Sequence, residues 1–340
     1  MDKKQLILDG KAILGIEFGS TRIKGVLIDD CGEVLAVGAF DWENSLVNGI
    51  WTYAEEEFFA GLKGCYGSLK NDVKEKYGIS IIPLGVTLGT KVYQDGVDIN
   101  PDDIYAHHEK TGELPKTTAA NVGECIDYFT ELTKDGAAVI HFTISSTMSS
   151  TYSNACLAAE EFENVYVVDS KNLSTGGGLQ VLAAAEMAQS GMEAADIVAK
   201  LEKITPCVDA SFVIDSLEYL HKGGRCSALA MLGANLLKLK PCIEVKNGVM
   251  GVGKKYRGVY GRVLSEYVTE RLQNVDDIDT TRAFVTHAGC DPEIVNAVLE
   301  QVKASGIFKE VLLTRAGCTV SAHCGANTLG VLFIRKSPIQ

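Results

Sequence analysis

The chain has 340 residues, a length that favours two or three domains of ordinary size over a single one. Its formal charge of −12 argues against general affinity for nucleic acid or for an anionic membrane, although transient membrane contact through a local basic patch stays open. No stretch approaches the roughly 20 apolar residues that a membrane span needs, and Asp9 and Lys11 interrupt the apolar run behind the basic start.

These features predict a cytoplasmic protein without a signal peptide. In a reducing cytosol the ten cysteines are expected to be thiols, and no two of them form a Cys-x-x-Cys pair. Most stand among apolar residues, which is typical of small buried side chains. The composition therefore predicts neither a metal site nor a bound cofactor.

Two strands are expected at 12–17 and 23–29, joined through Phe18-Gly19-Ser20-Thr21, and a third at 34–40. From residue 53 to 77 apolar side chains recur at three and four residues, which predicts a helix. Gly78 is a plausible end for that helix and for the first segment of the chain.

From residue 79 onward short apolar runs alternate with helical patterns, beginning with a strand at 79–84. An Asn-Gly pair at 247–248 predicts a β-hairpin, because both residues tolerate a positive φ. This alternation predicts an α/β fold with a mainly parallel sheet and helices on both faces. Further strands are expected at 137–143, 165–169, 209–214, 283–287, 310–314 and 329–335, and helices at 123–132, 151–162, 177–190, 193–204, 215–221, 228–237, 259–273 and 292–305.

Hydroxyl side chains gather between the strand at 137–143 and the following helix, including Ser146 and Ser149. Ligands collect at the carboxyl ends of strands in such sheets, and a helix N-terminus favours an anion. An ordinary N-cap is the alternative, but one serine would suffice for it. A second turn carries Thr117 and Thr118, and the two turns together could supply two or three uncharged donors to one carboxylate.

Two further polar residues stand in glycine-containing turns. Arg225 ends Lys222-Gly223-Gly224-Arg225 and either faces a ligand or caps a carbonyl group. His323 lies in a stretch, Ser321–Asn327, that is too rich in glycine and polar residues to be core and is expected to be a loop. A lone histidine is more often structural, so a functional role for His323 stays one of two alternatives.

From about residue 77 to 336 the sequence resembles the DegV family of bacterial fatty-acid-binding proteins. The resemblance rests on short stretches in the order in which that family has them: Lys76–Ile79, Asp95-Gly96-Val97-Asp98-Ile99, Lys116-Thr117-Thr118, Ser145-Ser146, Ser149–Tyr152, Val168-Asp169-Ser170, Lys222–Arg225, Leu239-Lys240-Pro241 and Ser321-Ala322-His323. The family's usual Thr-Ser-Gln-Pro turn reads Thr-Thr-Ala-Ala here, at 117–120.

The resemblance implies two α/β subdomains, at 79–205 and 206–340, that close over one long-chain, palmitate-like fatty acid. It places the carboxylate at Thr117 and Ser149, with Thr118 and Ser146 beside them and with Arg225 and His323 nearby. It also implies a separate fatty acid kinase as partner, to which this non-enzymatic carrier presents its lipid for acyl-phosphate formation.

The start of the chain departs from that family. Residues 13–51 instead resemble the beginning of an FGGY-type carbohydrate kinase, whose first phosphate hairpin falls on Gly19, Ser20 and Thr21. The alternative function is therefore a carbohydrate-kinase-like phosphotransferase, but the later phosphate loop, adenosine motif and catalytic aspartate of such kinases have no counterpart. The chain divides into a kinase-like segment at 1–78 and the two subdomains, and 12–16 or 23–28 is expected to replace the first strand of the DegV-like sheet.

Overall fold

The computed structural model describes residues 3–8, 12–18, 22–29, 31–41, 45–47, 50–52, 65, 80–226 and 239–339. The contacts of the chain divide it into two units, Met1–Ile81 and Ile82–Gln340. This division falls close to the predicted end of the first segment at residue 78. The further division of the second unit at 205 and 206 stays a prediction.

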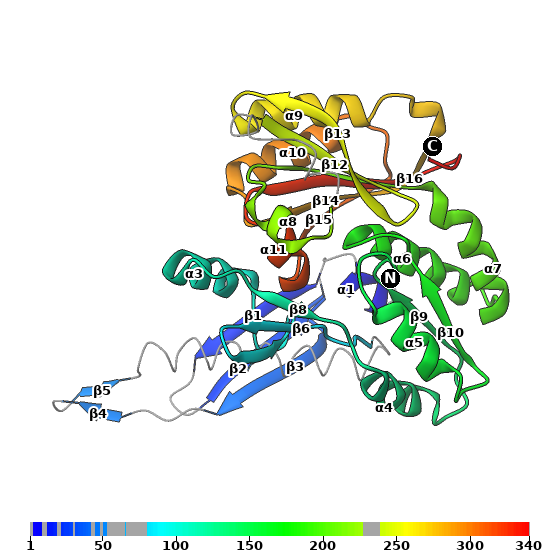
Figure 1. Ribbon diagram of the computed structural model, residues 1–340. Helices are drawn as coiled ribbons and strands as arrows, with labels where there is room; N and C mark the ends of the chain where they lie inside the picture. Colours follow the sequence, from blue (N-terminus) through cyan, green and yellow to red (C-terminus); the bar gives the residue numbers. More distant parts are fainter. Residues whose placement is uncertain are drawn as a thin grey trace. The chain divides into compact units, whose positions relative to one another are not determined.

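The first unit contains a three-stranded antiparallel sheet in the order β1-β2-β3 (Figure 1). The three predicted strands are thus confirmed, but within the described residues they pair only with one another. The expectation that one of them completes the sheet of the second unit stays a prediction. The predicted helix at 53–77 lies outside the described residues apart from Cys65. The elements are α1 (Lys3–Leu8), β1 (Ile13–Phe18), β2 (Arg22–Ile28), β3 (Val34–Asp41), β4 (Ser45–Val47) and β5 (Ile50–Thr52).

The second unit begins with a small antiparallel sheet and a strand–helix–strand unit. β9 and β10 pair in parallel and α5 connects them, as the alternation of patterns predicts. Residues 80–84 are not a strand; the first strand starts at Gly85 and pairs with both β7 and β8. The elements are β6 (Gly85–Leu88), β7 (Lys91–Gln94), α3 (Pro101–Thr111), β8 (Lys116–Thr118), α4 (Val122–Thr133), β9 (Val139–Thr143), α5 (Thr151–Ala159), β10 (Val165–Asp169), α6 (Thr175–Gln189) and α7 (Ala194–Ile204).

The rest of the second unit is built on a six-stranded sheet in the order β13-β12-β11-β16-β14-β15. Only β14 and β15, joined by α10, are parallel, and the other four pairings are antiparallel. The prediction of a mainly parallel sheet is therefore wrong. The elements are η1 (Thr205–Cys207), β11 (Val208–Ile214), α8 (Glu218–Gly223), β12 (Leu239–Lys246), β13 (Val249–Arg257), α9 (Tyr260–Arg271), η4 (Val275–Asp277), β14 (Ile278–Ala288), α10 (Pro292–Ala304), β15 (Glu310–Arg315), α11 (Cys318–Cys324) and β16 (Thr328–Arg335).

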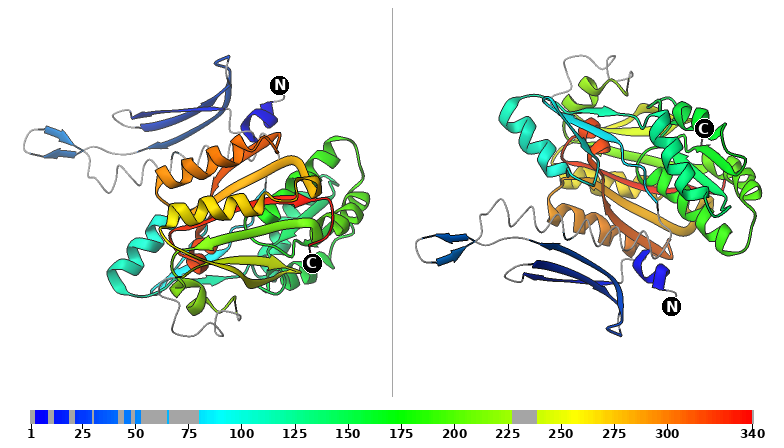
Figure 2. Two further views of the ribbon diagram at one scale, coloured as in Figure 1. Left: turned by 90° about the horizontal axis from the view of Figure 1, so that it is seen from above. Right: turned by 90° about the horizontal axis from the view of Figure 1, so that it is seen from below.

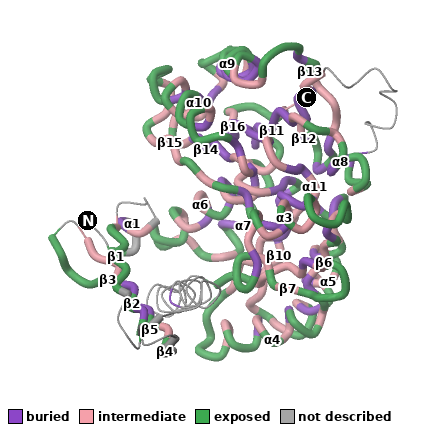
Figure 3. The backbone as a smooth tube through the Cα atoms, turned by 90° about the vertical axis from the view of Figure 1, so that its left-hand side faces the viewer, coloured by how far each residue is buried: buried purple, intermediate pink, exposed green. Residues whose placement is uncertain are grey.

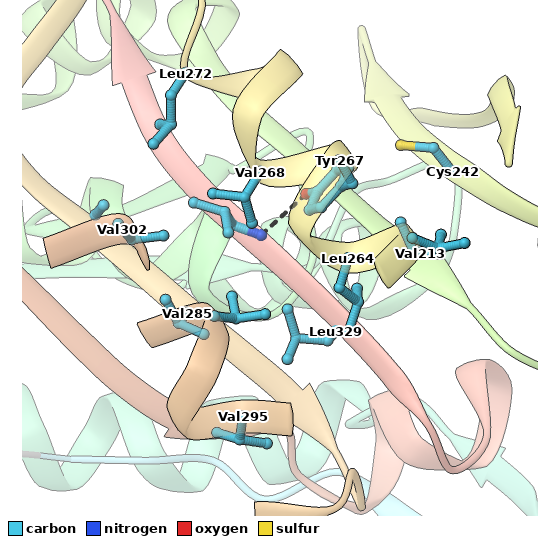
Figure 4. Close-up of a cluster of buried hydrophobic side chains, with 14 of the residues drawn as sticks. Val213, Cys242, Leu264, Tyr267, Val268, Leu272, Val285, Val295, Val302 and Leu329 are labelled. Atoms are coloured by element: carbon cyan, nitrogen blue, oxygen red, sulfur yellow. Dashed lines mark hydrogen bonds between the residues drawn. The ribbon is translucent and has the colours of Figure 1, made fainter. Parts of the chain in front are cut away.

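Both faces of the six-stranded sheet are covered. α9 and α10 lie side by side over one face (Figure 2), and every residue of β11 is buried (Figure 3). Under α9 the Tyr267 hydroxyl accepts a hydrogen bond from the Val331 amide, drawn as the dashed line in Figure 4. It also donates to the Ser211 carbonyl. A fully buried phenol keeps both partners, as a buried polar group must. The opposite face of the sheet packs in a second cluster of buried side chains, which includes Phe212, Phe284 and Leu332.

None of the ten cysteines, all of which lie in the described ranges, forms a disulfide, and eight are buried. This confirms the expectation of buried thiols. No helix in the described part of the chain combines the length and apolarity needed to cross a membrane.

Candidate functional site

Five of the six residues singled out in the second unit line one pocket of about 220 Å³. Its lining residues come from both sides of residue 205 and are spread along the sequence from Leu84 to Cys324. The lining residues are Leu84, Thr117, Thr118, Ala119, Ile144, Met148, Ser149, Ser150, Leu173, Arg225, Met250, Thr319, Val320, His323 and Cys324. We call this the head-group pocket.

Thr117 stands on β8, where it pairs with Val86 of β6 rather than occupying the expected turn. Its hydroxyl oxygen lies 2.9 Å from Nε2 of His323, 206 residues away along the chain. The fold therefore brings together two residues that the sequence places in unrelated stretches.

His323 lies on a buried helix, α11, and not on the loop that the sequence predicted. The helix is held at its start by Asp95, whose carboxylate accepts the amide protons of Cys318 and Thr319 at 2.7 Å each. Two backbone N–H groups that no helical carbonyl can satisfy thus find a partner. The glycine and polar residues around His323 hid this helix in the sequence, because its cap comes from a segment more than 200 residues away.

Burial, together with the nearby charge of Arg225, lowers the pKa of His323 to about 4, so its imidazole is neutral at pH 7. Nδ1 is buried without a hydrogen-bond partner among the described residues. Because orphaned N–H groups are rarer than orphaned acceptors, we place the proton on Nε2, which then donates to Thr117. The hydroxyl proton of Thr117 is left free to donate to a ligand.

Ser149 ends the hydroxyl loop, residues 144–150, which joins β9 to α5. Its Oγ accepts a hydrogen bond from the Thr151 amide at 3.2 Å and lies 2.9 Å from the Thr151 hydroxyl. Both bonds can use Ser149 as the acceptor, so its own proton is also available to a ligand. The predicted position at the start of a helix is confirmed, since α5 begins at Thr151.

Arg225 caps a carbonyl group, which is one of the two alternatives that the sequence left open, and its contact with a ligand stays a prediction. It follows Gly224, which has a φ of +68°, and its guanidinium donates a hydrogen bond of 2.7 Å to the Gly223 carbonyl. The side chain also lines the head-group pocket and is exposed to solvent. A cation that remains accessible suits the entrance of a pocket better than its interior.

Thr118 lines the same pocket, but Ser146 does not. The Ser146 hydroxyl donates a 2.6 Å hydrogen bond to the Asp169 carboxylate, which also accepts its amide proton. The structure therefore places Ser146 in a contact between the carboxyl ends of β9 and β10, outside the pocket lining.

A second, apolar cavity of about 30 Å³ adjoins the head-group pocket, and sequence reasoning missed it. The two share Leu173, Val320 and Cys324 as walls. The other residues of this tail cavity are Ser174, Ala210, Phe212, Thr286, His287, Ala288, Ala316, Thr328, Gly330 and Leu332.

The tail cavity lies on one face of three neighbouring strands, where Phe212, Gly330 and Thr286 stand opposite one another. A Cβ on Gly330 would lie 2.9 Å from that of Phe212, so only glycine fits there. The Thr286 hydroxyl is bonded to those of Thr175 and Thr314, at 2.7 and 3.0 Å. Its hydrogen bonds are thus made away from the cavity, which stays apolar. The sequence signal for this cavity is the small residues at alternate positions of β11, β14 and β16, such as Ala210, Ala288 and Gly330.

A larger pocket of about 420 Å³ lies elsewhere in the second unit, among Asp169, Lys171, Glu202 and Lys246. Lysines and carboxylates face it together, and none of the predicted site residues lines it. We assign it no ligand, because its charges select for neither sign. Gly19, Ser20 and Thr21 lie outside the described residues, and no metal-binding group of His, Cys, Asp and Glu occurs among the residues that are described.

The chain matches the family described as "Uncharacterised protein, DegV family" over residues 67–336. The chain is 31% identical over 267 residues to a DegV domain-containing protein of Clostridium acetobutylicum, covering 77% of this chain and 92% of that protein. It is 29% identical over 276 residues to the protein DegV of Bacillus subtilis, covering 79% and 96%. The kinase-like resemblance of residues 13–51 has no support among these matches and stays a prediction.

Solved structures give the same result for the fold. A fatty-acid-binding DegV family protein of Thermus thermophilus superimposes with a TM-score of 0.72 at 29% identity, over 79% of this chain and 96% of that one. DegV of Bacillus subtilis, described as a fatty acid binding protein, gives 0.68 at 29% identity, over 78% and 95%. A stearic-acid-binding protein of Eubacterium ventriosum gives 0.66 at 27% identity, over 77% and 93%.

Proposed function

This chain belongs to the DegV family, and we propose that it binds one long-chain fatty acid, with the carboxylate in the head-group pocket and the acyl chain in the tail cavity. The observation that carries the proposal is the adjacency of the two: hydroxyl donors line one, and the other, beyond a shared wall, is apolar. The similar structures from Thermus thermophilus and Bacillus subtilis are of fatty-acid-binding proteins.

The carboxylate is the part of the ligand that needs specific partners. Burying an unpaired charge costs several kcal/mol, and hydrogen bonds from charged or hydroxyl groups offset that cost. In the proposal Thr117 and Ser149 each donate one hydroxyl proton to it, and such charge-assisted bonds are stronger than neutral ones. His323 is neutral, and its Nε2 proton fixes the direction of the Thr117 hydroxyl.

The acyl chain supplies most of the binding energy. Transfer of each methylene from water is favourable by roughly 0.8 kcal/mol, on the order of 12 kcal/mol for a C16 chain before the cost of association is subtracted. Leu173, Val320 and Cys324 stand where the chain would pass from one cavity to the other. The tail cavity of about 30 Å³ is much smaller than a C16 chain, so in this proposal its walls move apart as the tail enters over the face of β11, β16 and β14.

The protein itself acts as a carrier in this proposal and leaves chemistry to a partner. Exposed Arg225 at the pocket entrance suits transfer of the head group to a separate fatty acid kinase, the partner that the family resemblance implies. We propose that His323 and Arg225 serve this transfer more than they serve retention of the tail.

Native mass spectrometry of the full chain tests the proposal. We expect one added mass of a C16 or C18 fatty acid for each chain, and its loss in a Thr117→Ala/Ser149→Ala double variant. Ser153→Ala on α5 is the matched control, because its hydroxyl donates to the Ser150 carbonyl and lies outside the pocket. A chain that carries no acyl mass, even after incubation with palmitate, would contradict the proposal.

A further inference from the structure

The hairpin between β12 and β13 reaches the hydroxyl loop, although more than 100 residues separate them. The carbonyl oxygen of Gly248 accepts two hydrogen bonds from that loop, from Ser145 Oγ at 2.8 Å and from Thr147 Oγ1. The two hydroxyls also lie 3.1 Å from each other. Ser145 is completely buried, so its bond is made out of contact with water.

Ser145 connects the hairpin to the head-group pocket through its backbone hydrogen bonds. Its carbonyl accepts the amide protons of Met148 at 2.9 Å and Ser149 at 3.2 Å, and its own amide donates to the Asn172 carbonyl at 2.9 Å. Side chain, carbonyl and amide of one buried residue are therefore all fixed. Met148 and Ser149 both line the pocket, so a shift of Ser145 moves two of its walls.

Only glycine fits at the tip of the hairpin. Gly248 has a φ of +84°, and a Cβ there would lie 2.6 Å from the Ser145 hydroxyl. The serine side chain is too short to move away from such a contact while keeping its hydrogen bond. A side chain at this position must therefore either turn the Ser145 hydroxyl away from the Gly248 carbonyl or separate the hairpin from the loop, and both break the contact.

We propose that Ser145, Thr147 and Gly248 form a latch that positions Ser149 and so controls how long the carboxylate is retained. The inference rests on the proposed function, and the three residues act through Ser149 rather than by touching the ligand. Opening the latch releases the head group and leaves the tail cavity unchanged, because no latch residue lines that cavity.

Gly248→Ala is the direct test, and Gly191→Ala is its control. Gly191 has nearly the same φ, +83°, but a Cβ there meets nothing within 4 Å, so the control carries the backbone strain without the collision. We expect palmitate to dissociate about tenfold faster from Gly248→Ala than from the control. Hexadecanol has the same tail without the carboxylate, and its dissociation should change less than threefold. Equal effects of the two alanine variants, or equal effects on the two ligands, would overturn the latch.

A second pair of variants separates the latch from a general loss of structure. Ser145→Ala removes the atom that the new Cβ would meet, so adding it to Gly248→Ala should give the rate of Ser145→Ala alone. If the two substitutions instead multiplied in their effects on the palmitate dissociation rate, the proposal would be overturned. Thr147→Ala removes one hydrogen bond from an exposed residue and should accelerate palmitate release about threefold even if Gly248→Ala fails to fold; an unchanged rate would contradict the latch.

Hydrogen exchange of the ligand-free full chain distinguishes failure of the latch from failure of the proposed function. The Met148 and Ser149 amides should exchange at least tenfold faster in Gly248→Ala than in Gly191→Ala. If the unmodified protein binds no palmitate, the proposed function fails while this exchange result still decides whether the latch exists. Unchanged exchange would overturn the latch whatever the protein binds.

Discussion

The head-group pocket and the tail cavity are built in opposite ways. The polar groups of the pocket come from four short elements: β8, the hydroxyl loop, the turn after α8, and α11. A contact that is remote in the sequence holds β8, the hydroxyl loop and α11. The tail cavity lies on one face of three adjacent strands, where register alone brings its residues together. Substitutions in the head-group pocket should therefore remove single hydrogen bonds to the carboxylate. Substitutions in the tail cavity should instead change its volume and the length of acyl chain that fits.

Removing both hydroxyl donors should have the largest effect. Thr117→Ala/Ser149→Ala leaves the carboxylate without two partners, each worth about 1–3 kcal/mol, so palmitate affinity should fall by a factor between about 30 and about 25,000. Isothermal titration calorimetry measures it, with Ser153→Ala as control. A double variant that binds palmitate as tightly as the control would contradict the assigned pocket.

Filling the tail cavity should change chain-length preference instead. Ala288 is buried on the cavity face of β14, and Ala288→Val should exclude about two methylenes, or about 1.6 kcal/mol, from a C16 chain. Palmitate affinity should fall about fifteenfold while laurate affinity changes less than twofold. Ala283→Val, on the opposite face of the same strand, controls for crowding in the core. Equal losses for laurate and palmitate in Ala288→Val would show that the tail lies elsewhere.

Acid should destabilise the ligand-free protein through two buried imidazoles. Burial lowers the pKa of His141 and, with Arg225, that of His323 to about 4, from an ordinary 6.5. Between these values the unfolded chain binds protons that the folded chain does not, so stability is complete above pH 6.5 and falls as the pH drops toward 4. We expect each imidazole to cost about 2 kcal/mol between pH 7 and pH 5.

Urea unfolding of His323→Gln and His141→Gln measures how the free energy of unfolding depends on pH, and it compares an imidazole in the head-group pocket with one outside it. Each variant should lose its own share of the pH effect. Palmitate should weaken the His323 share only, because a bound carboxylate favours the protonated imidazole, whereas His141 packs against Phe129 away from the pocket. A palmitate effect on both shares alike would argue against a carboxylate beside His323.

Arg225→Gln should have the smallest effect on binding. The guanidinium is exposed and already bonded to the Gly223 carbonyl, so palmitate affinity should change less than about threefold, the scale of an exposed charge. Acyl-phosphate formation with a partner fatty acid kinase should fall more. Equal reductions of the two would assign Arg225 a structural role.

Local patterns predicted most strands and helices, because period and turn chemistry are properties of neighbouring residues. β10 matches its predicted bounds, and the Asn-Gly pair is the turn between β12 and β13. Strand direction was not predictable in this way: an apolar run looks the same whichever way it enters the sheet, and β16 runs antiparallel to both of its neighbours.

The site residues likewise divide into those that local patterns predicted and those that only the strand register brings together. Thr117, Ser149, Arg225 and His323 were found through hydroxyl-rich and glycine-containing stretches and through the family resemblance, and the structure brings all four to one pocket. Ser146 was drawn in by its neighbours, but its hydroxyl is bonded to Asp169. The tail cavity was missed because its small residues sit on three strands, and only their register places them together.

A crystal structure of the full chain grown with palmitate tests the central claim most directly. We expect one palmitate for each chain, with its carboxylate within hydrogen-bond distance of Thr117 Oγ1 and Ser149 Oγ. Its tail should pass Leu173, Val320 and Cys324 onto the face of β11, β16 and β14. A lipid bound with its carboxylate away from both hydroxyls, or an empty head-group pocket at saturating palmitate, would contradict the account.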